Sequence, residues 1–380
     1  MAEQLPINPA ILFWARQRAG LTREQAAKKF ARIAEWESGE LAPTYPQLEQ
    51  LADALKVPIA VFFFPDPPDV PSIEETFRTL PDAEIGQLPS RIRMLLRKAK
   101  AFQLNLHELT HDRNPAERLI TRDLTFPTNI NVEEMAAAVR AYIGVPVEEQ
   151  QSWRDDDTAQ KEWRAALLRV GIFIFKDAFK LEEYSGFCLY DELFPIIYVN
   201  NSATKTRQMF TYFHELAHLL FHTSGIDSEH DRYIPHLKLD AQRIETLCNR
   251  FAAHFLLPDA EMQRAMQGRE ATGATATLLA AQFHVSRAVI FRRYLDQKLI
   301  NQSQYDESIS HWDGQKSDSG ANNSGNHYWS KLSYLGRDYV ALALGQFHQN
   351  RIDQNQLADY LDTKPRNVGT LEDYFSRGNA

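Results

Sequence analysis

The stretch His214-Glu215-Leu216-Ala217-His218 combines residue types and a spacing that can do chemistry. At about 3.6 residues per turn, positions four apart lie on one face of a helix, so His214 and His218 can present two imidazoles to one Zn²⁺. Glu215 directly follows the first histidine, and a carboxylate there can take a proton from a water that the metal has made more acidic. The pattern is typical of zinc hydrolases and predicts amide hydrolysis at this site.

Two histidines leave zinc one protein ligand short, so the chain must supply a third donor. His222 continues the four-residue spacing, but it lies about 12 Å of helix rise from His214, too far to share one ion. We therefore expect His222 to pack at the helix end or to line a pocket. A metzincin site would need Gly and His at the positions of Phe221 and Ser224, so that class of zinc site is excluded.

A second apolar helical pattern, which follows a polar loop expected over residues 223–240, supplies a candidate for the third ligand. Glu245 lies within this pattern, and a buried glutamate is costly unless it is paired or bound to metal. Asn249, one turn later, is placed to hydrogen-bond a ligand histidine. Two alternatives stay open. Glu245 can instead be a solvated charge on the helix surface, and the ligand can come from the polar loop, from Asp227, Glu229 or His230.

Three segments, in order along the chain, resemble the ImmA/IrrE-like metallopeptidase family. Residues 186–191 (GFCLYD) and 196–200 (IIYVN) are similar to its substrate-side strands, and residues 213–218 (FHELAH) to its metal helix. The last segment is residues 245–258 (ETLCNRFAAHFLLP), in which Cys248 stands where the family usually has Ala. The resemblance covers roughly residues 126–310 and is specific, because three spaced motifs agree in order.

This resemblance implies a zinc-dependent endopeptidase of the gluzincin type, with Glu245 as third zinc ligand beside His214 and His218. Glu215 is then the general base. The resemblance further implies a regulator that cuts a transcriptional repressor in a stress, mobile-element or toxin-antitoxin context. The alternative is a non-proteolytic regulator or antitoxin that binds DNA or protein. An intact Glu215 favours the enzyme, because a purely structural zinc site would not need it.

The β-rich residues 186–200 come directly before the metal helix. We expect an edge strand there, because such a strand can pair with an extended substrate and align one peptide bond over the zinc. The residue that stabilises the oxyanion is not assigned by the sequence. Tyr212, His222 and His254 are near enough in the chain to be candidates.

The composition limits the setting in which the protein works. The 380 residues are enough for two to four domains with real cores. A net charge of −8, from 42 basic and 50 acidic residues, argues against broad polyanion binding. Cys188 and Cys248 are the only cysteines, and we see no signal-peptide pattern or membrane-spanning run. We therefore expect a cytoplasmic protein with no membrane partner; its oligomeric state is not indicated.

The first 65 residues predict several short helices around one core. Asn8 before Pro9 predicts a capped helix start, and Thr22 with Gln25 predicts a capping box. Residues 21–27 (LTREQAA) and 36–39 (WESG) resemble an XRE-type helix-turn-helix domain.

This domain departs from the usual pattern in a place that matters for DNA. Between Ala27 and Trp36 the chain is about four residues shorter than usual, at the turn and the start of the recognition helix. Residues 1–65 also carry seven basic and seven acidic side chains, so no basic surface is evident. We expect at most weak DNA binding, and docking of a protein is the alternative role.

These signals predict an α+β, mostly helical multidomain chain. A zincin-like (gluzincin) metallopeptidase domain lies between an amino-terminal helix-turn-helix domain and a carboxyl-terminal helical domain. Successive prolines in residues 65–71 predict a stiff linker, and the Gly-, Ser- and Asn-rich composition of residues 311–326 predicts a flexible one. The predicted divisions are the shortened helix-turn-helix domain 1–65, the linker and connecting helices 66–125, the peptidase 126–310, the flexible linker 311–326, and the helix-turn-helix-like module 327–380.

Overall fold

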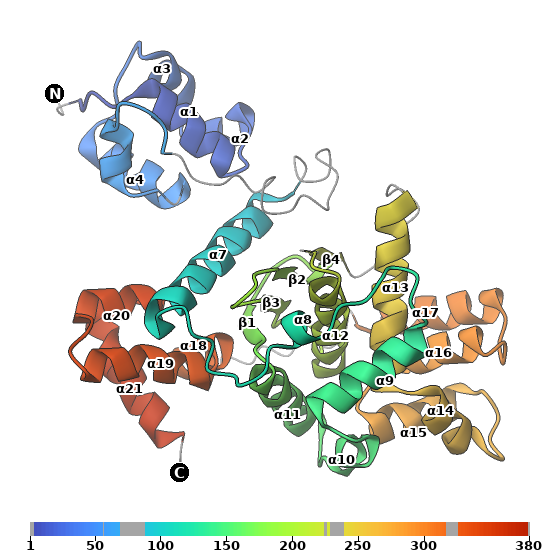
Figure 1. Ribbon diagram of the computed structural model, residues 1–380. Coiled ribbons are helices and arrows are strands. Elements are labelled where there is room, and N and C mark those ends of the chain that lie inside the picture. The colour runs from blue at the N-terminus through green and yellow to red at the C-terminus, as the bar shows by residue number, and fades with distance from the viewer. Residues whose placement is uncertain are drawn as a thin grey trace. The chain divides into compact units, whose positions relative to one another are not determined.

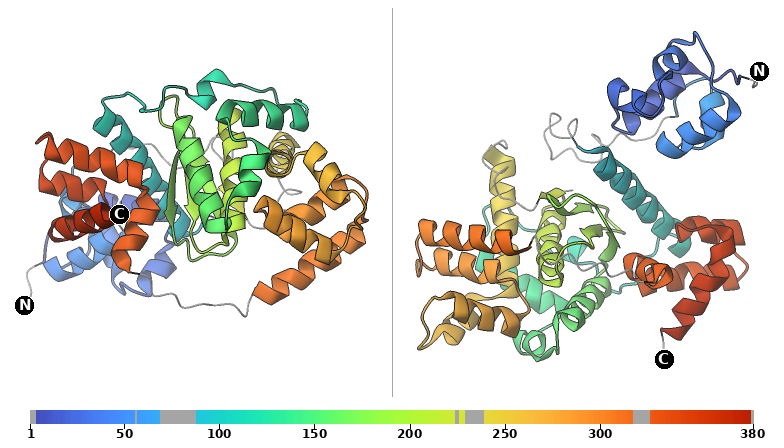
Figure 2. Two further views of the ribbon diagram at one scale, coloured as in Figure 1. Left: turned by 90° about the horizontal axis from the view of Figure 1, so that it is seen from below. Right: turned by 180° about the vertical axis from the view of Figure 1, so that it is seen from behind.

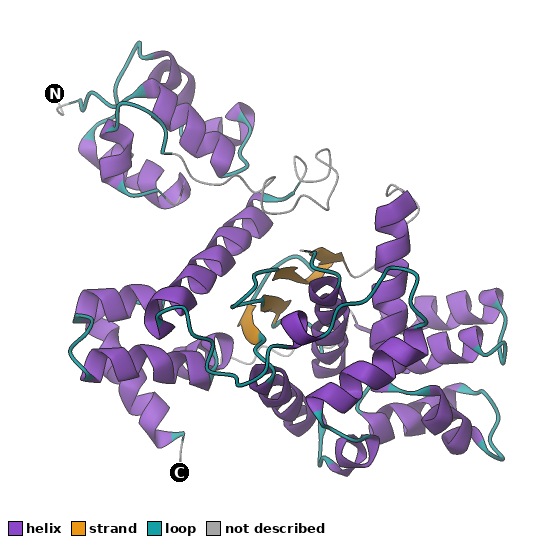
Figure 3. Ribbon diagram, viewed as in Figure 1, coloured by secondary structure: helices purple, strands orange, loops and turns teal. Residues whose placement is uncertain are grey.

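The computed structural model describes residues 4–55, 57–68, 88–223, 226–228, 239–316 and 326–378. The chain divides into two compact units, Met1–Lys100 and Ala101–Ala380 (Figure 1). Helices dominate both units, and the described strands form one small sheet in the second unit (Figure 3). The expectation of a mostly helical chain with a small β component is confirmed.

The first unit is built from short helices around its own apolar core. This core includes Ile11, Trp36, Leu48 and Phe62, each at most 4% exposed. Both predicted helix starts are confirmed: the Asn8 side chain accepts from the backbone of Ala10, and Thr22 and Gln25 form a complete capping box. The elements are α1 (Pro9–Arg18), α2 (Arg23–Ala27), α3 (Ile33–Ser38), α4 (Tyr45–Leu55), the 3-10 helix η1 (Ile59–Phe63) and the start of α7 (Ser90–Thr110).

The second unit contains the sheet and most of the helices. Its elements, in chain order, are the end of α7, α8 (Ile120–Asp123), α9 (Val132–Ile143), α10 (Val147–Ser152), α11 (Asp156–Arg169), β1 (Phe173–Asp177), β2 (Tyr184–Leu189), β3 (Ile196–Asn200), α12 (Lys205–Leu220), β4 (Ile226–Ser228), α13 (Leu239–Leu256), α14 (Asp259–Met266), α15 (Gly273–Phe283), α16 (Arg287–Asp296), α17 (Gln302–Lys316), α18 (His327–Leu335), α19 (Arg337–His348), α20 (Gln354–Tyr360), the 3-10 helix η3 (Pro365–Asn367) and α21 (Val368–Arg377).

The strand order of the sheet is β1-β3-β2-β4, with β1 parallel to β3 and the other pairs antiparallel. The expected edge strand within residues 186–200 is therefore wrong, because β2 and β3 each have a neighbour on both sides. Among the described strands, β1 and β4 form the edges. The short strand β4 lies inside the stretch predicted as a polar loop, and its pairing with β2 makes β2 an inner strand.

Alternating side chains place the two faces of the sheet in different surroundings. Ile197 and neighbouring residues of one face belong to the large core shared with α12 and α13. On the other face, Phe102 of α7 stacks on Phe175 with ring centroids 4.7 Å apart, and Tyr339 of α19 meets the same ring edge-on at 5.1 Å. The carboxyl-terminal helices α18–α21 and the helices α13–α17 thus lie on opposite sides of the sheet (Figure 2).

Tyr339 explains why the carboxyl-terminal helices are part of the second unit. It is 1% exposed, and its hydroxyl accepts from Asn105 of α7 and donates to the backbone carbonyl of Tyr360. Arg164 of α11 adds a bond to the backbone carbonyl of Ser333 at the end of α18. These helices therefore complete the core behind the sheet.

Two of the predicted linkers fall partly outside the described residues. Residues 69–71 of the proline-rich stretch and residues 317–325 of the Gly- and Ser-rich stretch are not described, whereas residues 311–316 continue α17. In the described part of the chain, no single helix is long and apolar enough to cross a membrane. Helices α15 and α16 meet that test only as a pair, and they are bent by 114° relative to each other.

Candidate metal centre

Helix α12 carries the histidine motif through the centre of the second unit. The Thr204 side chain accepts from the backbone of Arg207 and so fixes where the helix begins. The helix continues without a break through the motif, and His214, Glu215 and His218 are each at most 3% exposed. The predicted buried helix is confirmed, with the two histidines one turn apart on one face.

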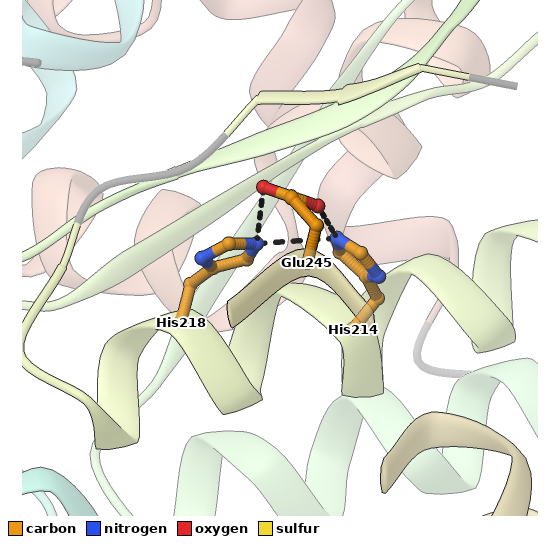
Figure 4. A group of neighbouring side chains, drawn as sticks. All are labelled: His214, His218 and Glu245. Carbon is orange, nitrogen blue, oxygen red and sulfur yellow. Dashed lines mark hydrogen bonds and ion pairs between the residues drawn. The ribbon is translucent and has the colours of Figure 1, made fainter. Parts of the chain in front are cut away.

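Helix α13 brings Glu245 to these two histidines (Figure 4). The Nε2 atoms of His214 and His218 are 3.2 Å apart, and the Glu245 carboxylate oxygens lie 3.4 Å and 3.2 Å from them. Ligand atoms about 2.0–2.1 Å from an ion, at tetrahedral angles, are separated by about 3.3–3.4 Å. The spacing of these nitrogen and oxygen atoms therefore fits a tetrahedral zinc site.

Glu245 is buried, at 5% exposed, so the alternative of a solvated surface charge is wrong. Burial alone would raise the pKa of this carboxyl group. The neighbouring imidazoles of His218 and His214, and their hydrogen bonds, outweigh burial and hold its pKa well below the usual range. The carboxylate is therefore ionised and ready to bind a cation. The loop alternatives cannot be compared with it, since Glu229, His230 and the side chain of Asp227 lie outside the described residues.

Each histidine has an oxygen partner for its second ring nitrogen. Asn249 Oδ1 lies 2.9 Å from His214 Nδ1, as the one-turn spacing from Glu245 predicted. Thr223 Oγ1 lies 3.4 Å from His218 Nδ1 and donates to the His218 carbonyl at 3.0 Å. An N–H on Nδ1 leaves the Nε2 lone pair directed at the centre. The role of Thr223 was missed, although a threonine just past the end of the motif helix was a signal that could have suggested it.

The surroundings of Glu215 are set by a close approach of β2 to α12. Thr211 lies one turn before Glu215 on the helix, and a Cβ added at Gly186 would stand only 2.5 Å from Thr211 Cγ2. Only glycine at this position lets the strand come so near. Strand β2, which contains Gly186, thus packs directly over the part of α12 that carries Glu215, the proposed general base.

The three candidates for stabilising an oxyanion are placed elsewhere. Tyr212 is two residues from His214, about 160° around the helix, and burial raises the pKa of its hydroxyl. His222 lies 3.0 Å from the Thr121 carbonyl and packs on Tyr190, so its expected role in helix-end packing is confirmed. His254 is about 13 Å of helix rise from Glu245. The structure therefore does not bring these three side chains to the centre.

His254 belongs to a second cluster of possible metal ligands, with Glu133 and Asp259. Its Nε2 lies 2.7 Å from Arg293 Nη1, and Asp259 also pairs with Arg293. Burial and the nearby Arg293 lower the pKa of His254 to about 4, so the ring is neutral. A neutral imidazole has one lone pair, and here it accepts from the guanidinium. No lone pair is left for a metal, so the interactions of Arg293 with His254 and Asp259 instead connect α16 to α13 and α14.

Comparison with known proteins agrees with this picture. Residues 168–294 match the family model described as IrrE N-terminal-like domain, a peptidase family, and residues 12–62 match a helix-turn-helix family model. A solved structure described as a Mycobacterium tuberculosis transcriptional regulator is 18% identical to this chain, covers 51% of each chain and has a TM-score of 0.29. This chain thus spans about half the length of that protein. No curated protein matches the chain.

The fold and the matched families define a metallopeptidase-type domain preceded by a helix-turn-helix domain of the DNA-binding, transcription-regulating class. The resemblance to ImmA/IrrE-like metallopeptidases with an amino-terminal XRE-type domain is confirmed over these two stretches of the chain.

Proposed function

We propose that this protein is a zinc-dependent endopeptidase that cleaves a protein partner, a transcriptional repressor, and regulates genes by doing so. One observation carries the proposal: two imidazole nitrogens and a buried carboxylate converge at 3.2–3.4 Å, with Glu215 next to one of the ligands. This donor set, His₂Glu, leaves a fourth position for water or substrate. A structural zinc site would instead be closed by a fourth protein ligand.

The side chains divide the work of amide hydrolysis. His214, His218 and Glu245 would hold the ion, which when bound polarises a scissile carbonyl and makes a water more acidic. Glu215 takes a proton from the attacking water and delivers it to the leaving nitrogen, as a general base and then a general acid. Asn249 and Thr223 hold the two rings by their Nδ1 atoms. Burial of the whole cluster excludes bulk water and strengthens these interactions.

The small sheet supports a proposal for how the substrate binds. Strand β4 is an edge of the sheet in the described part of the chain, and it pairs with β2, which lies over α12. An extended polypeptide can add to such an edge through main-chain hydrogen bonds. This supports a protein substrate bound as a strand, at β4 and not at residues 186–200.

The amino-terminal unit is proposed to dock the substrate, with weak DNA binding at most. Helix α3, at the position of the recognition helix, is six residues long, and Ile33 and Trp36 are buried in the core. Glu37 of the same helix is held by Arg16 and Arg23. Helix α3 is short, two of its side chains are buried, and its Glu37 is already paired with arginines of α1 and α2, so it offers few side chains to base edges.

The test is to incubate the zinc-loaded protein with the product of the neighbouring gene and to identify new peptide termini by mass spectrometry. Wild type should make one cut, and Glu215→Gln should keep zinc and fold but cut about a hundredfold more slowly or worse. Equal rates for the two proteins would contradict Glu215 as general base. Cleavage by neither, with zinc bound, would favour the non-proteolytic regulator.

A further inference from the structure

The face of α12 that carries the metal ligands continues toward the start of the helix. Phe210 lies one turn before His214, and the centroids of the two rings are 6.4 Å apart. At about 100° per residue, positions 207, 210, 214 and 218 fall within a sector of about 80° of the helix surface. Phe210 and Arg207 therefore lie on the same face of α12 as His214 and His218.

Phe210 is the one side chain in residues 208–220 of this helix that is not buried. All the others in that range are buried, whereas Phe210 is partly exposed and packs against the large core. Ligand sites are lined mostly by apolar and aromatic side chains, with a few polar groups that fix orientation. A partly exposed ring beside the metal ligands therefore offers an apolar contact to whatever binds there.

Arg207 holds the Phe210 ring and connects it to the sheet. The guanidinium carbon of Arg207 lies 5.4 Å from the centroid of the Phe210 ring, and Arg207 Nε donates to Ser185 Oγ at 3.0 Å. Ser185 belongs to β2 and lies where the register between β2 and β4 shifts. The ring is therefore paired with the ring of His214 and, through Arg207, connected to the strand pair proposed to receive the substrate.

We propose that Phe210 forms an apolar subsite that binds a large apolar side chain of the substrate next to the scissile bond. The inference rests on the proposed function. A scissile carbonyl at the centre formed by His214, His218 and Glu245 places the next residue of an extended substrate about 3.3 Å farther along. Ring pairs interact with their centroids about 4.5–7 Å apart. An aromatic or long aliphatic side chain of that residue can therefore reach the Phe210 ring.

An acidic substrate side chain bound by Arg207 is the main alternative for this face of α12. Arg207 lies about 10 Å of helix rise from His214, against about 6 Å for Phe210, so the residue beside the scissile bond meets the ring first. The guanidinium group also donates to Ser185 and stacks on the ring. The geometry therefore favours an apolar side chain over an acidic one.

The test measures the binding of small hydroxamates, which anchor to zinc and so place a side chain beside it without any cleavage. The zinc-loaded full chain is titrated by isothermal calorimetry with 3-phenylpropionohydroxamate and with acetohydroxamate, and the ratio of the two affinities is compared between variants. The phenyl compound should bind wild type about tenfold more tightly. Phe210→Ala should reduce this ratio to about threefold or less. The matched control Phe347→Ala, at a partly buried phenylalanine of α19 behind the sheet, should keep it.

Circular dichroism and metal analysis check that each variant is folded and holds zinc. If Phe210→Ala does not fold, Phe210→Gln, which keeps much of the side-chain length but not the ring, has the same expected result. Equal affinities of the two hydroxamates in wild type, an unchanged ratio in a folded Phe210 variant, or an equal loss in Phe347→Ala would overturn the inference. A ratio that depends on Phe210 in a protein that cleaves no polypeptide would leave the subsite standing while the proposed function fails. Cleavage of polypeptides without such a ratio would do the reverse.

Discussion

The contact between Asn249 and His214 predicts how tightly the centre holds zinc. In Asn249→Ala, the proton on Nδ1 of a fully buried ring loses the acceptor that lies 2.9 Å away. A buried donor left without a partner costs about 1–3 kcal/mol, and about 1.4 kcal/mol corresponds to a factor of ten in an equilibrium constant. We therefore expect the zinc Kd to rise about 10–100-fold, within the range known for partners of metal-binding histidines.

The assay is competition for zinc with a chromophoric chelator at neutral pH, with circular dichroism to confirm the fold. Asn249→Asp is the matched control, because it keeps an acceptor oxygen and should bind zinc at least as tightly as wild type. Thr223→Val should weaken binding less than Asn249→Ala, since its oxygen lies farther from the ring, at 3.4 Å. Wild-type zinc affinity in a folded Asn249→Ala variant would refute the positioning role of this amide.

Three further predictions concern parts of the molecule away from the metal. The folded-state pKa of His254, about 4, lies below its usual value of 6.5, so its contribution to stability is present above about pH 6.5 and lost as the pH falls toward 4. Between these pH values the thermal unfolding temperature should fall more steeply with decreasing pH in wild type than in His254→Gln. Equal slopes for the two proteins would contradict this. Tyr339→Ala should lower the free energy of unfolding by about 3–5 kcal/mol in urea, against about 1 kcal/mol or less for the 43% exposed Trp329→Ala, and similar values for both would contradict a shared core behind the sheet. Residues 1–65 alone should show no sequence-selective gel shift at physiological salt, and tight selective binding would reverse the docking proposal.

The parts of the site that the sequence predicted are those set by helix geometry. The spacing of His214 and His218, and the one-turn step from Glu245 to Asn249, each follow from a fixed number of residues per turn. The apolar pattern around Glu245 favoured its burial, and the structure decides against the solvated alternative. Its approach to the two histidines depends on how α12 and α13 cross, and the family resemblance supplied that pairing where the periodicity could not.

The parts that the sequence missed depend on contacts between distant segments. The β-rich composition of residues 186–200 and the family resemblance indicated strands near Gly186 but could not give the strand order, so the partner of β2 on its outer side was not foreseen. That partner, β4, is only three residues long and lies in a stretch of loop-like composition. Likewise, nothing in the local pattern around Tyr339 indicated that α19 would cover the back of the sheet.

X-ray absorption at the zinc edge of the loaded protein tests the central claim most directly, because it reports the atoms bound to the metal. His214, His218 and Glu245 as ligands predict one zinc per chain with nitrogen and oxygen neighbours at about 2.0–2.1 Å. They also predict that Glu245→Ala loses zinc under mild chelation. A neighbour at the zinc–sulfur distance of about 2.3 Å, from Cys188 or Cys248, or full zinc occupancy in Glu245→Ala, would contradict it.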